Sequence, residues 1–261
     1  MVENAQVLDV AGLPTEPGPP PRITVLQQSA DAPLDLLGAA LGDDVRLMRL
    51  FRGEPVPAPE SVGSGLVVLG GPMNAYDDAA APWLPATRAL IAAAVAADVP
   101  TLAVCLGAQL LAEVGGGRVR KGVDGPEVGA TLVAKRDAAD ADPLFRPLPL
   151  SPDVIQFHHD EIAELPRGAT LLASNPAYPH QAFRVGRHVY GLQFHIETTP
   201  EIVAQWAEQD TVGVAASGLD RETICARAAA VHPDLEEAWA PFAGRFADLV
   251  RSRATAGAGT A

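Results

Sequence analysis

A thiol, an imidazole and a carboxylate stand at the ends of two apolar runs that predict buried strands. Cys105 follows the run 101–104, and His195 and Glu197 lie at the end of the run 189–194. Side chains two positions apart on a strand point the same way, so we expect His195 and Glu197 to share one face. A thiol, a base and a carboxylate that orients the base can cleave an amide through a covalent intermediate. These residues therefore predict a Cys-His-Glu catalytic triad.

The residues around Cys105 predict a sharp turn from a strand into a helix. An isolated cysteine is more often a small core residue, but a helix is expected to begin directly after this one. The positive end of the helix dipole favours a thiolate at Cys105, and Gly107 lets the turn close without a Cβ clash. A glycine often stands two residues before such a nucleophile. Here that position is Ala103, which is small enough for the turn.

Gly70 and Gly71, followed by a proline, end another apolar run. A plain turn is one interpretation of this segment. The other applies if its strand lies beside the cysteine strand. In that case the backbone N–H of Gly71, next to Gly70, and that of Leu106 form an oxyanion hole.

The polar segment that begins with His158 has two interpretations, a solvated loop and a substrate-binding loop. Adjacent histidines on a strand point to opposite faces and chelate poorly, and no third histidine or cysteine stands nearby at ligand spacing. We therefore expect neither a metal nor another cofactor. In the substrate-binding interpretation, Asp160 binds an ammonium group.

The elements that position these groups alternate between strand and helix. This alternation predicts an α/β fold with a doubly wound, mostly parallel, flavodoxin-like sheet flanked by helices. Short strands in the middle of the chain suggest a mixed sheet edge or a small antiparallel subsheet. The main strands are expected at 23–26, 45–50, 65–71 and 101–104, the helices at 34–41, 83–97 and 108–114, and the short strands at 128–134, 154–157, 170–173, 181–185 and 189–194.

Four regions are expected along the chain. Residues 1–21 form a disordered Pro-rich arm, 22–199 the catalytic domain, 200–253 a C-terminal helical extension and 254–261 a disordered tail. In the last helix, large apolar side chains fall on one stripe, which we expect to pack on the domain, a dimer contact being the alternative. The stripe consists of Leu235, Trp239, Phe242, Phe246 and Leu249.

The composition limits the kinds of partner and compartment. The 261 residues carry a formal net charge of −13, which argues against binding nucleic acid or an anionic membrane surface. Two cysteines, Cys105 and Cys225, do not suggest a disulfide framework and favour a reducing, cytoplasmic location. The longest apolar stretch, 99–112, is too short to span a bilayer, and the first residues do not resemble a secretory signal.

Together these segments resemble the class I glutamine amidotransferases. The matching strings are CLGAQ at 105–109, FHIE at 194–197 and LGGPM at 69–73. The resemblance extends over 22–209. Within the family it is greatest to the free-standing domains similar to the amidotransferase part of GMP synthetase, through the strings FHHD at 157–160, QAFR at 181–184 and GGPMN at 70–74.

This resemblance implies roles that spacing alone does not reveal. Gln109 matches a residue that contacts bound glutamine, and Asp160 one that holds the α-amino group of the substrate, with His158 in the same string. Glu127 matches the glutamate of a Glu-x-Gly string that recurs in the family, and the sequence does not reveal the role of this glutamate. Ile196 stands where the family usually has proline, which changes the rigidity of the strand end and removes no catalytic group.

The expected reaction is hydrolysis of the γ-amide of glutamine or of a γ-glutamyl compound through a cysteinyl thioester. In one version the released ammonia passes to a separate synthetase chain, because no Gly-x-x-x-x-Gly-Lys loop for ATP is present. In the other the chain acts alone as a γ-glutamyl peptidase or hydrolase. A non-catalytic regulatory or binding protein on the same fold is a third hypothesis.

Overall fold

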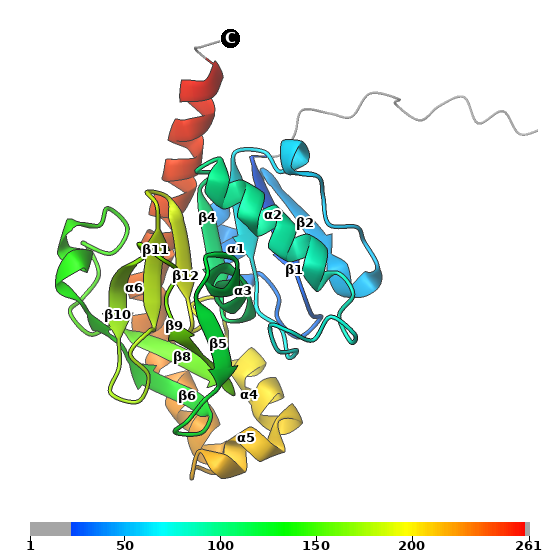
Figure 1. Ribbon diagram of the computed structural model, residues 1–261. Helices are drawn as coiled ribbons and strands as arrows, with labels where there is room; N and C mark the ends of the chain where they lie inside the picture. The colour runs from blue at the N-terminus through cyan, green and yellow to red at the C-terminus, as the bar shows by residue number, and fades with distance from the viewer. Residues whose placement is uncertain (1–21, 259–261) are drawn as a thin grey trace, which may run out of the picture.

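The computed structural model describes residues 22–258, with side chains through residue 254. Its centre is an eight-stranded sheet (Figure 1). The strands are β1 (Ile23–Gln27), β2 (Val45–Arg49), β3 (Gly65–Val68), β4 (Thr101–Val104), β7 (Ala134–Lys135), β10 (Thr170–Ser174), β11 (Ala182–Val185) and β12 (Val189–Leu192). Their order is β2-β1-β3-β4-β12-β11-β10-β7. The first five in this order are parallel to one another, and the last three continue the sheet antiparallel. The predicted doubly wound, mostly parallel α/β sheet is confirmed.

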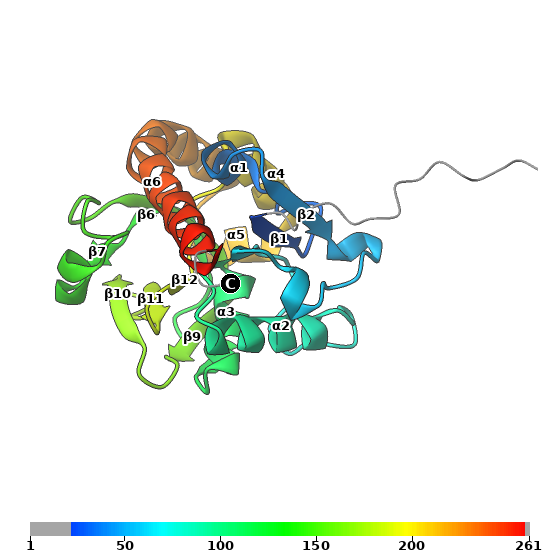
Figure 2. The ribbon, with the colours of Figure 1, turned by 90° about the horizontal axis from the view of Figure 1, so that it is seen from above.

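Helices cover both faces of the sheet. Alternate residues of β3 enter opposite apolar clusters, because neighbouring side chains of a strand point to opposite faces. Val67 packs with residues of α1 (Asp35–Leu41) and α6 (Arg221–Ala258), whereas Leu66 and Val68 pack with residues of α2 (Leu84–Ala96) and α3 (Leu106–Val114). Figure 2 shows the two pairs of helices on either side of the strands. The helices are α1 (Asp35–Leu41), α2 (Leu84–Ala96), α3 (Leu106–Val114), α4 (Pro200–Gln209), α5 (Thr211–Ala216) and α6 (Arg221–Ala258), with short 3₁₀ turns at Leu50–Arg52, Pro59–Ser61 and Asp137–Ala141.

Two small antiparallel sheets complete the fold. β6 (Glu127–Leu132) pairs with β8 (Asp153–His158), close to the predicted positions, while β5 (Arg118–Lys121) and β9 (Asp160–Glu164) form a pair that the sequence did not predict. Strand β5 is a charged RVRK segment without an apolar run. Its pairing is supported instead by cross-strand ion pairs, which propensity alone does not reveal. These join Arg118 to Glu164 and Arg120 to Glu161.

The C-terminal helix packs on the domain, as expected. Its stripe Leu235, Trp239, Phe242 and Phe246 is fully buried, and Leu249 packs partly against the same cluster. The indole N–H of Trp239 donates to the carbonyl of Asp153 at 2.8 Å, which ties α6 to β8. The helix runs past its expected end at residue 253 to Ala258 and projects beyond the sheet in Figure 1. The predicted arm 1–21 and the last residues of the predicted tail, 259–261, lie outside the described residues.

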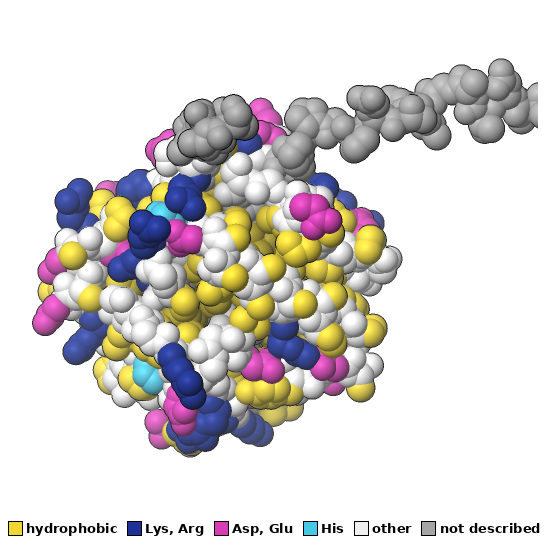
Figure 3. All heavy atoms as spheres, turned by 45° about the horizontal axis from the view of Figure 1, so that its top comes forward, with side chains coloured by type: hydrophobic (Ala, Val, Ile, Leu, Met, Phe, Trp, Pro, Cys, Tyr) yellow, Lys and Arg dark blue, Asp and Glu magenta, His cyan; other side chains and the backbone are white. Residues whose placement is uncertain are grey.

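The surface carries both signs of charge. On the face in Figure 3, small groups of basic side chains lie beside acidic ones, with apolar side chains between them. Within residues 22–258, none of the helices has the length and apolar character needed to cross a bilayer.

Candidate active site

The carboxyl ends of three neighbouring parallel strands converge at one edge of the sheet. Gly70 and Gly71 follow β3, Cys105 follows β4, and the segment containing His195 follows β12. Ligands of open α/β sheets bind beyond this edge. The strand order therefore brings together groups that are far apart in the sequence.

Cys105 occupies a strained turn between β4 and α3. Its φ of 49° and ψ of −110° are unusual for a residue with a side chain, and such a backbone costs roughly 1–3 kcal/mol. Its N–H donates to the carbonyl of Leu192 at 2.7 Å, and its carbonyl accepts the N–H of Gln109 at 3.0 Å, as α3 begins. A Cβ on Gly107 would lie 2.2 Å from the carbonyl oxygen of Val68. Glycine is therefore required there, as the sequence predicted.

His195 and Glu197 meet, although not on one strand. The expectation of a continuous strand through both was wrong: β12 ends at Leu192, and His195 leaves the sheet to bridge Ile155 of β8. Nδ1 of His195 donates to Oε1 of Glu197 at 2.7 Å, and both side chains are buried, with 4% and 1% exposed. This hydrogen bond leaves Nε2 of the ring for another partner.

Ile196 takes part in this arrangement through its backbone. Its N–H donates to Oε2 of Glu197 at 2.9 Å. A proline at this position has no N–H and could not make this bond. The departure from the usual family pattern therefore adds a hydrogen bond to the carboxylate that orients His195.

The side chains of His195 and Cys105 converge over Gly70. An ideal Cβ on Gly70 would lie 3.3 Å from Cε1 of His195 and 3.4 Å from Cβ of Cys105. On another side, the ring of Trp206 in α4 packs against the imidazole, with ring centroids 4.7 Å apart. The imidazole is thus confined between the turn at Cys105 and helix α4.

The surroundings of His195 favour its protonated form. Burial is the largest influence and lowers the pKa of His195, but it is outweighed by the charges of Glu197 and Cys105 and by hydrogen bonding to both. The net effect raises the pKa of His195 from 6.5 to about 10. An imidazolium beside a sulfur is the arrangement that sustains a thiolate and can later deliver a proton.

A cavity of about 600 Å³ opens over these groups. Six of the nine residues that the sequence singled out line it: Gly71, Cys105, Gln109, His158, Asp160 and His195. The other three, Gly70, Leu106 and Glu197, are not among the lining residues. Within residues 22–258, the N–H groups of Gly71 and Leu106 have no hydrogen-bond acceptor. Both donors are thus available to a ligand near Cys105.

The predicted substrate residues differ in what they can offer a ligand. Both amide hydrogens of Gln109 are used, since Nε2 donates to the carbonyl of Asp160 at 3.2 Å and to Oε1 of Gln193 at 3.3 Å. Both ring nitrogens of His158 also face partners within the protein. The carboxylate of Asp160 has no polar partner within the described residues. Asp160 can therefore offer a ligand its whole charge, whereas His158 cannot hydrogen-bond one.

Three further residues at or beside the cavity were not found from the sequence. Nε2 of Gln193 points to the sulfur of Cys105 at 3.9 Å. Trp206 lines the cavity and donates from its indole N–H to the carbonyl of Asp31 at 2.7 Å. Lys121 is the one lysine or arginine lining this cavity, and within residues 22–258 its ammonium group has no ion-pair partner. Of these three, only Gln193 could have been found from the sequence, because it stands two residues before His195.

The described part of the chain offers no metal centre. No three His, Cys, Asp or Glu side chains are grouped there as metal ligands would be. Cys105 and Cys225 are both free thiols.

Comparisons with known proteins agree with this geometry. A sequence model of the family described as glutamine amidotransferase class-I matches residues 51–208. Over 134 residues, the chain is 32% identical to a GMP synthase (glutamine-hydrolyzing) from Staphylococcus carnosus, covering 51% of this chain and 24% of that protein. Over 142 residues, it is 30% identical to gamma-glutamyl peptidase 3 from Arabidopsis thaliana, covering 53% of this chain and 56% of the peptidase.

A solved structure of a glutamine amidotransferase from Thermotoga maritima superposes with a TM-score of 0.76 at 28% identity, covering 87% of this chain and 97% of the other. The match thus covers nearly all of the solved chain and most of this one. It spans only about a quarter of the synthase and just over half of the peptidase.

Proposed function

The chain belongs to the class I glutamine amidotransferase family, and from that premise we propose that it hydrolyses the γ-amide of glutamine or of a γ-glutamyl compound. One observation carries the proposal: the strained Cys105 and the buried His195, which Glu197 orients, line a single cavity. Each group has the surroundings that covalent amide hydrolysis requires.

The first half of the reaction forms a thioester and releases an amine. The Cys105 thiolate attacks the γ-carbonyl carbon, a C–S bond forms, and the carbonyl electron pair moves to oxygen. The free N–H groups of Gly71 and Leu106 donate to this oxyanion, where each donor is worth roughly a hundredfold in rate. Nε2 of His195 then gives its proton to the nitrogen as the C–N bond breaks. Ammonia or an amine leaves.

The second half of the reaction hydrolyses the thioester and regenerates the free enzyme. His195, now neutral, accepts a proton from water while the water oxygen attacks the thioester carbon. The C–S bond breaks, the sulfur leaves as thiolate beside the regenerated imidazolium, and glutamate departs. Glu197 holds the ring in the required tautomer throughout.

The proposal also assigns recognition of the glutamyl group. The Asp160 carboxylate binds the α-amino group, and the unpaired Lys121 ammonium faces the α-carboxylate. These two residues are direct cross-strand neighbours in the β5–β9 pair, so their side chains lie on the same face of the small sheet. Oε1 of Gln109 remains as an acceptor for substrate.

Two versions of the reaction differ in the leaving group. In the first, ammonia passes to an acceptor enzyme on a separate chain, as the name of the synthase relative suggests. In the second, the chain acts alone on γ-glutamyl peptides or amines, as the name of the peptidase relative suggests. A cavity of about 600 Å³ has room for ligands larger than an amino acid, so it can admit the γ-glutamyl peptides and amines of the second version.

Kinetics on purified protein test the proposal. Glutamine, γ-glutamyl peptides and γ-glutamyl amines are compared as substrates of the wild type and of Cys105→Ala, with Cys225→Ala as the matched control. We expect turnover of at least one substrate class, its loss in Cys105→Ala and its retention in Cys225→Ala. Preference for free glutamine supports the ammonia-supplying version. A folded wild type that turns over none of them, or an active Cys105→Ala, refutes the proposal and favours a non-catalytic binding protein.

A further inference from the structure

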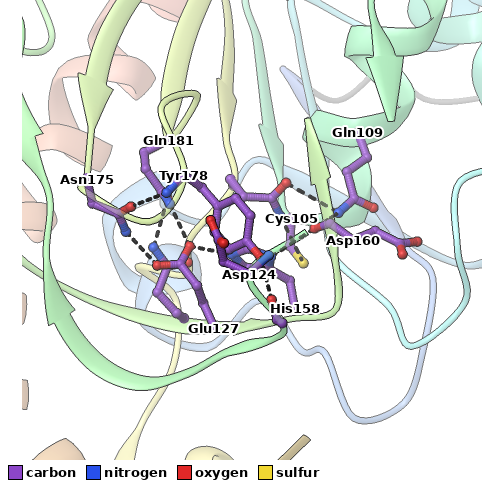
Figure 4. A network of polar contacts seen from close by, with 12 residues as sticks. Cys105, Gln109, Asp124, Glu127, His158, Asp160, Asn175, Tyr178 and Gln181 are labelled. Atoms are coloured by element: carbon purple, nitrogen blue, oxygen red, sulfur yellow. Dashed lines mark hydrogen bonds and ion pairs between the residues drawn. The ribbon is translucent and has the colours of Figure 1, made fainter. Parts of the chain in front are cut away.

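A carboxylate behind the cavity, with 12% of its side chain exposed, is surrounded by three polar side chains. Oε1 of Glu127, at the start of β6, accepts from Nδ2 of Asn175 at 2.6 Å. Oε2 accepts from Nε2 of Gln181 at 2.7 Å and faces Nε2 of His158 at 3.0 Å. Figure 4 shows these groups gathered around the carboxylate. The reaction derived above does not use Glu127, which nevertheless fixes one charge in one orientation.

His158 connects this carboxylate to the wall of the cavity. Its Nδ1 lies 2.8 Å from the carbonyl oxygen of Asp160, while its Nε2 faces Glu127. A carbonyl oxygen and a carboxylate only accept hydrogen bonds, so each of these contacts forms through a hydrogen on the ring nitrogen that faces it. With only 3% of its side chain exposed, His158 acts as a rigid spacer between Glu127 and Asp160.

The backbone carbonyl of Asp160 accepts hydrogen bonds from two side chains. His158 donates to it from the side of Glu127, and Gln109 donates from the side of the nucleophile at 3.2 Å. One hydrogen bond further on, Gln109 contacts Gln193, whose amide points to the sulfur of Cys105. A carbonyl oxygen has two lone pairs, and both are engaged here.

The side chain of Asp160, in contrast, has no polar partner within residues 22–258. Asp160 lines the cavity at the first position of β9. The direction of its carboxylate is therefore set through its backbone, and the backbone is held by His158 and Gln109. A free carboxylate on a clamped backbone is a preorganised site for a cation.

We infer that Glu127 is a positioning residue for the substrate's amino group: through His158 it fixes the backbone of Asp160 and so aims the Asp160 carboxylate. The inference rests on the proposed function, in which Asp160 binds the α-amino group. Its alternative is a purely structural network, which would affect folding and all substrates alike.

The test compares three substrates that differ only at the α-carbon. Glutamine carries the α-amino and α-carboxylate groups, and its α-decarboxylated and α-deaminated analogues each lack one of them. For Glu127→Gln, we expect KM to rise about tenfold for the two substrates with an amino group, since a lost hydrogen bond to a charged group is worth roughly that factor. We expect kcat within about twofold and KM for the deaminated analogue unchanged, because only uniform binding is lost.

A double variant tests whether Glu127 acts through Asp160. In Asp160→Asn the amino-group contact is already impaired, so adding Glu127→Gln is expected to raise KM for glutamine little further. Coupled residues give such non-additive effects. The matched control is Glu236→Gln, which removes an exposed carboxylate of α6, outside the β5–β9 pair. This control is expected to leave every KM unchanged.

The outcomes separate the two hypotheses. An equal rise of KM for all substrates, an unchanged KM for glutamine, or additive effects with Asp160→Asn would overturn the inference. If Glu127→Gln does not fold, Asn175→Ala removes one donor and keeps the carboxylate. A smaller rise confined to the amino-bearing substrates supports the inference in that variant, and its absence counts against it. A wild type inactive on every γ-glutamyl substrate refutes the proposed function instead.

Discussion

Replacing Glu197 with glutamine tests the electrostatics of the site. The carboxylate accepts from His195 Nδ1 at 2.7 Å inside the protein, and its charge is the largest influence that raises the pKa of His195. Glutamine keeps the size of the side chain and removes the charge. Its amide can also turn its NH₂ group toward Nδ1, which selects the wrong tautomer of the ring.

The magnitude follows from the pKa of His195. A net rise from 6.5 to about 10 corresponds to roughly 5 kcal/mol of preference for the imidazolium. We expect Glu197→Gln to lose much of this preference and to lower kcat by about 10²–10⁴-fold, the usual range for an impaired acid–base group. The Ile196 N–H, which now donates to the carboxylate, loses a charged acceptor as well.

The assay is kcat/KM against pH from 5 to 11. In the wild type we expect the basic limb near pH 10, where His195 loses its proton, and in Glu197→Gln a basic limb shifted toward 6.5. The free energy of unfolding should depend on pH in the same direction. Because folding raises the pKa of His195, the stability that its protonated form contributes is complete below about pH 6.5 and is lost as pH rises toward 10. A variant with an unshifted basic limb and a rate within threefold of wild type would refute this reasoning.

Three further predictions concern a tight turn beside Cys105, a substrate contact and the core. Gly107→Ala should fail to fold or lose several kcal/mol of unfolding free energy, because its Cβ would lie 2.2 Å from the Val68 carbonyl; Gly244→Ala, with no atom within 4 Å, should be neutral or stabilising by up to about 1 kcal/mol in the same urea titration. Lys121→Met should raise KM for substrates with a free α-carboxylate but not for their α-amides, and equal KM changes for both would count against the assignment. Trp239→Ala should cost about 3–5 kcal/mol by thermal unfolding, since the side chain is fully buried in the core; a loss under 1 kcal/mol would contradict that.

The sequence was sufficient for the main part of the sheet and for the segments that meet at its carboxyl edge. Apolar runs identified the buried strands that precede Cys105 and Gly71, because a strand covered on both faces has little polar surface. The elbow at Cys105 followed from a strand, a small residue and Gly107 in series. The family resemblance given by the triad segments is confirmed by the match over residues 51–208.

The sequence was insufficient where pairing depends on distant residues. The segment from His195 leaves the sheet because it bridges Ile155, which stands forty positions earlier and carries no local signal for this contact. Strand β5 depends on ion pairs with β9. Lys121 could therefore not be placed in the cavity before that pairing was known.

The same limit applies to residues that act through others. The role of Glu127 was not derivable from the sequence, since its three partners come from other elements of the chain. His158 was predicted to contact substrate, whereas both of its ring nitrogens are engaged inside the protein. Only the folded chain distinguishes a side chain that faces a ligand from one that supports it.

The central claim is that the sulfur of Cys105 carries the γ-glutamyl group during turnover. The most direct measurement is mass spectrometry of the protein, quenched in acid during steady-state hydrolysis of its best substrate and then digested. The account predicts a γ-glutamyl adduct on the peptide containing Cys105 and none on that containing Cys225. Steady turnover with the adduct on another residue, or undiminished turnover in Cys105→Ala, would contradict it.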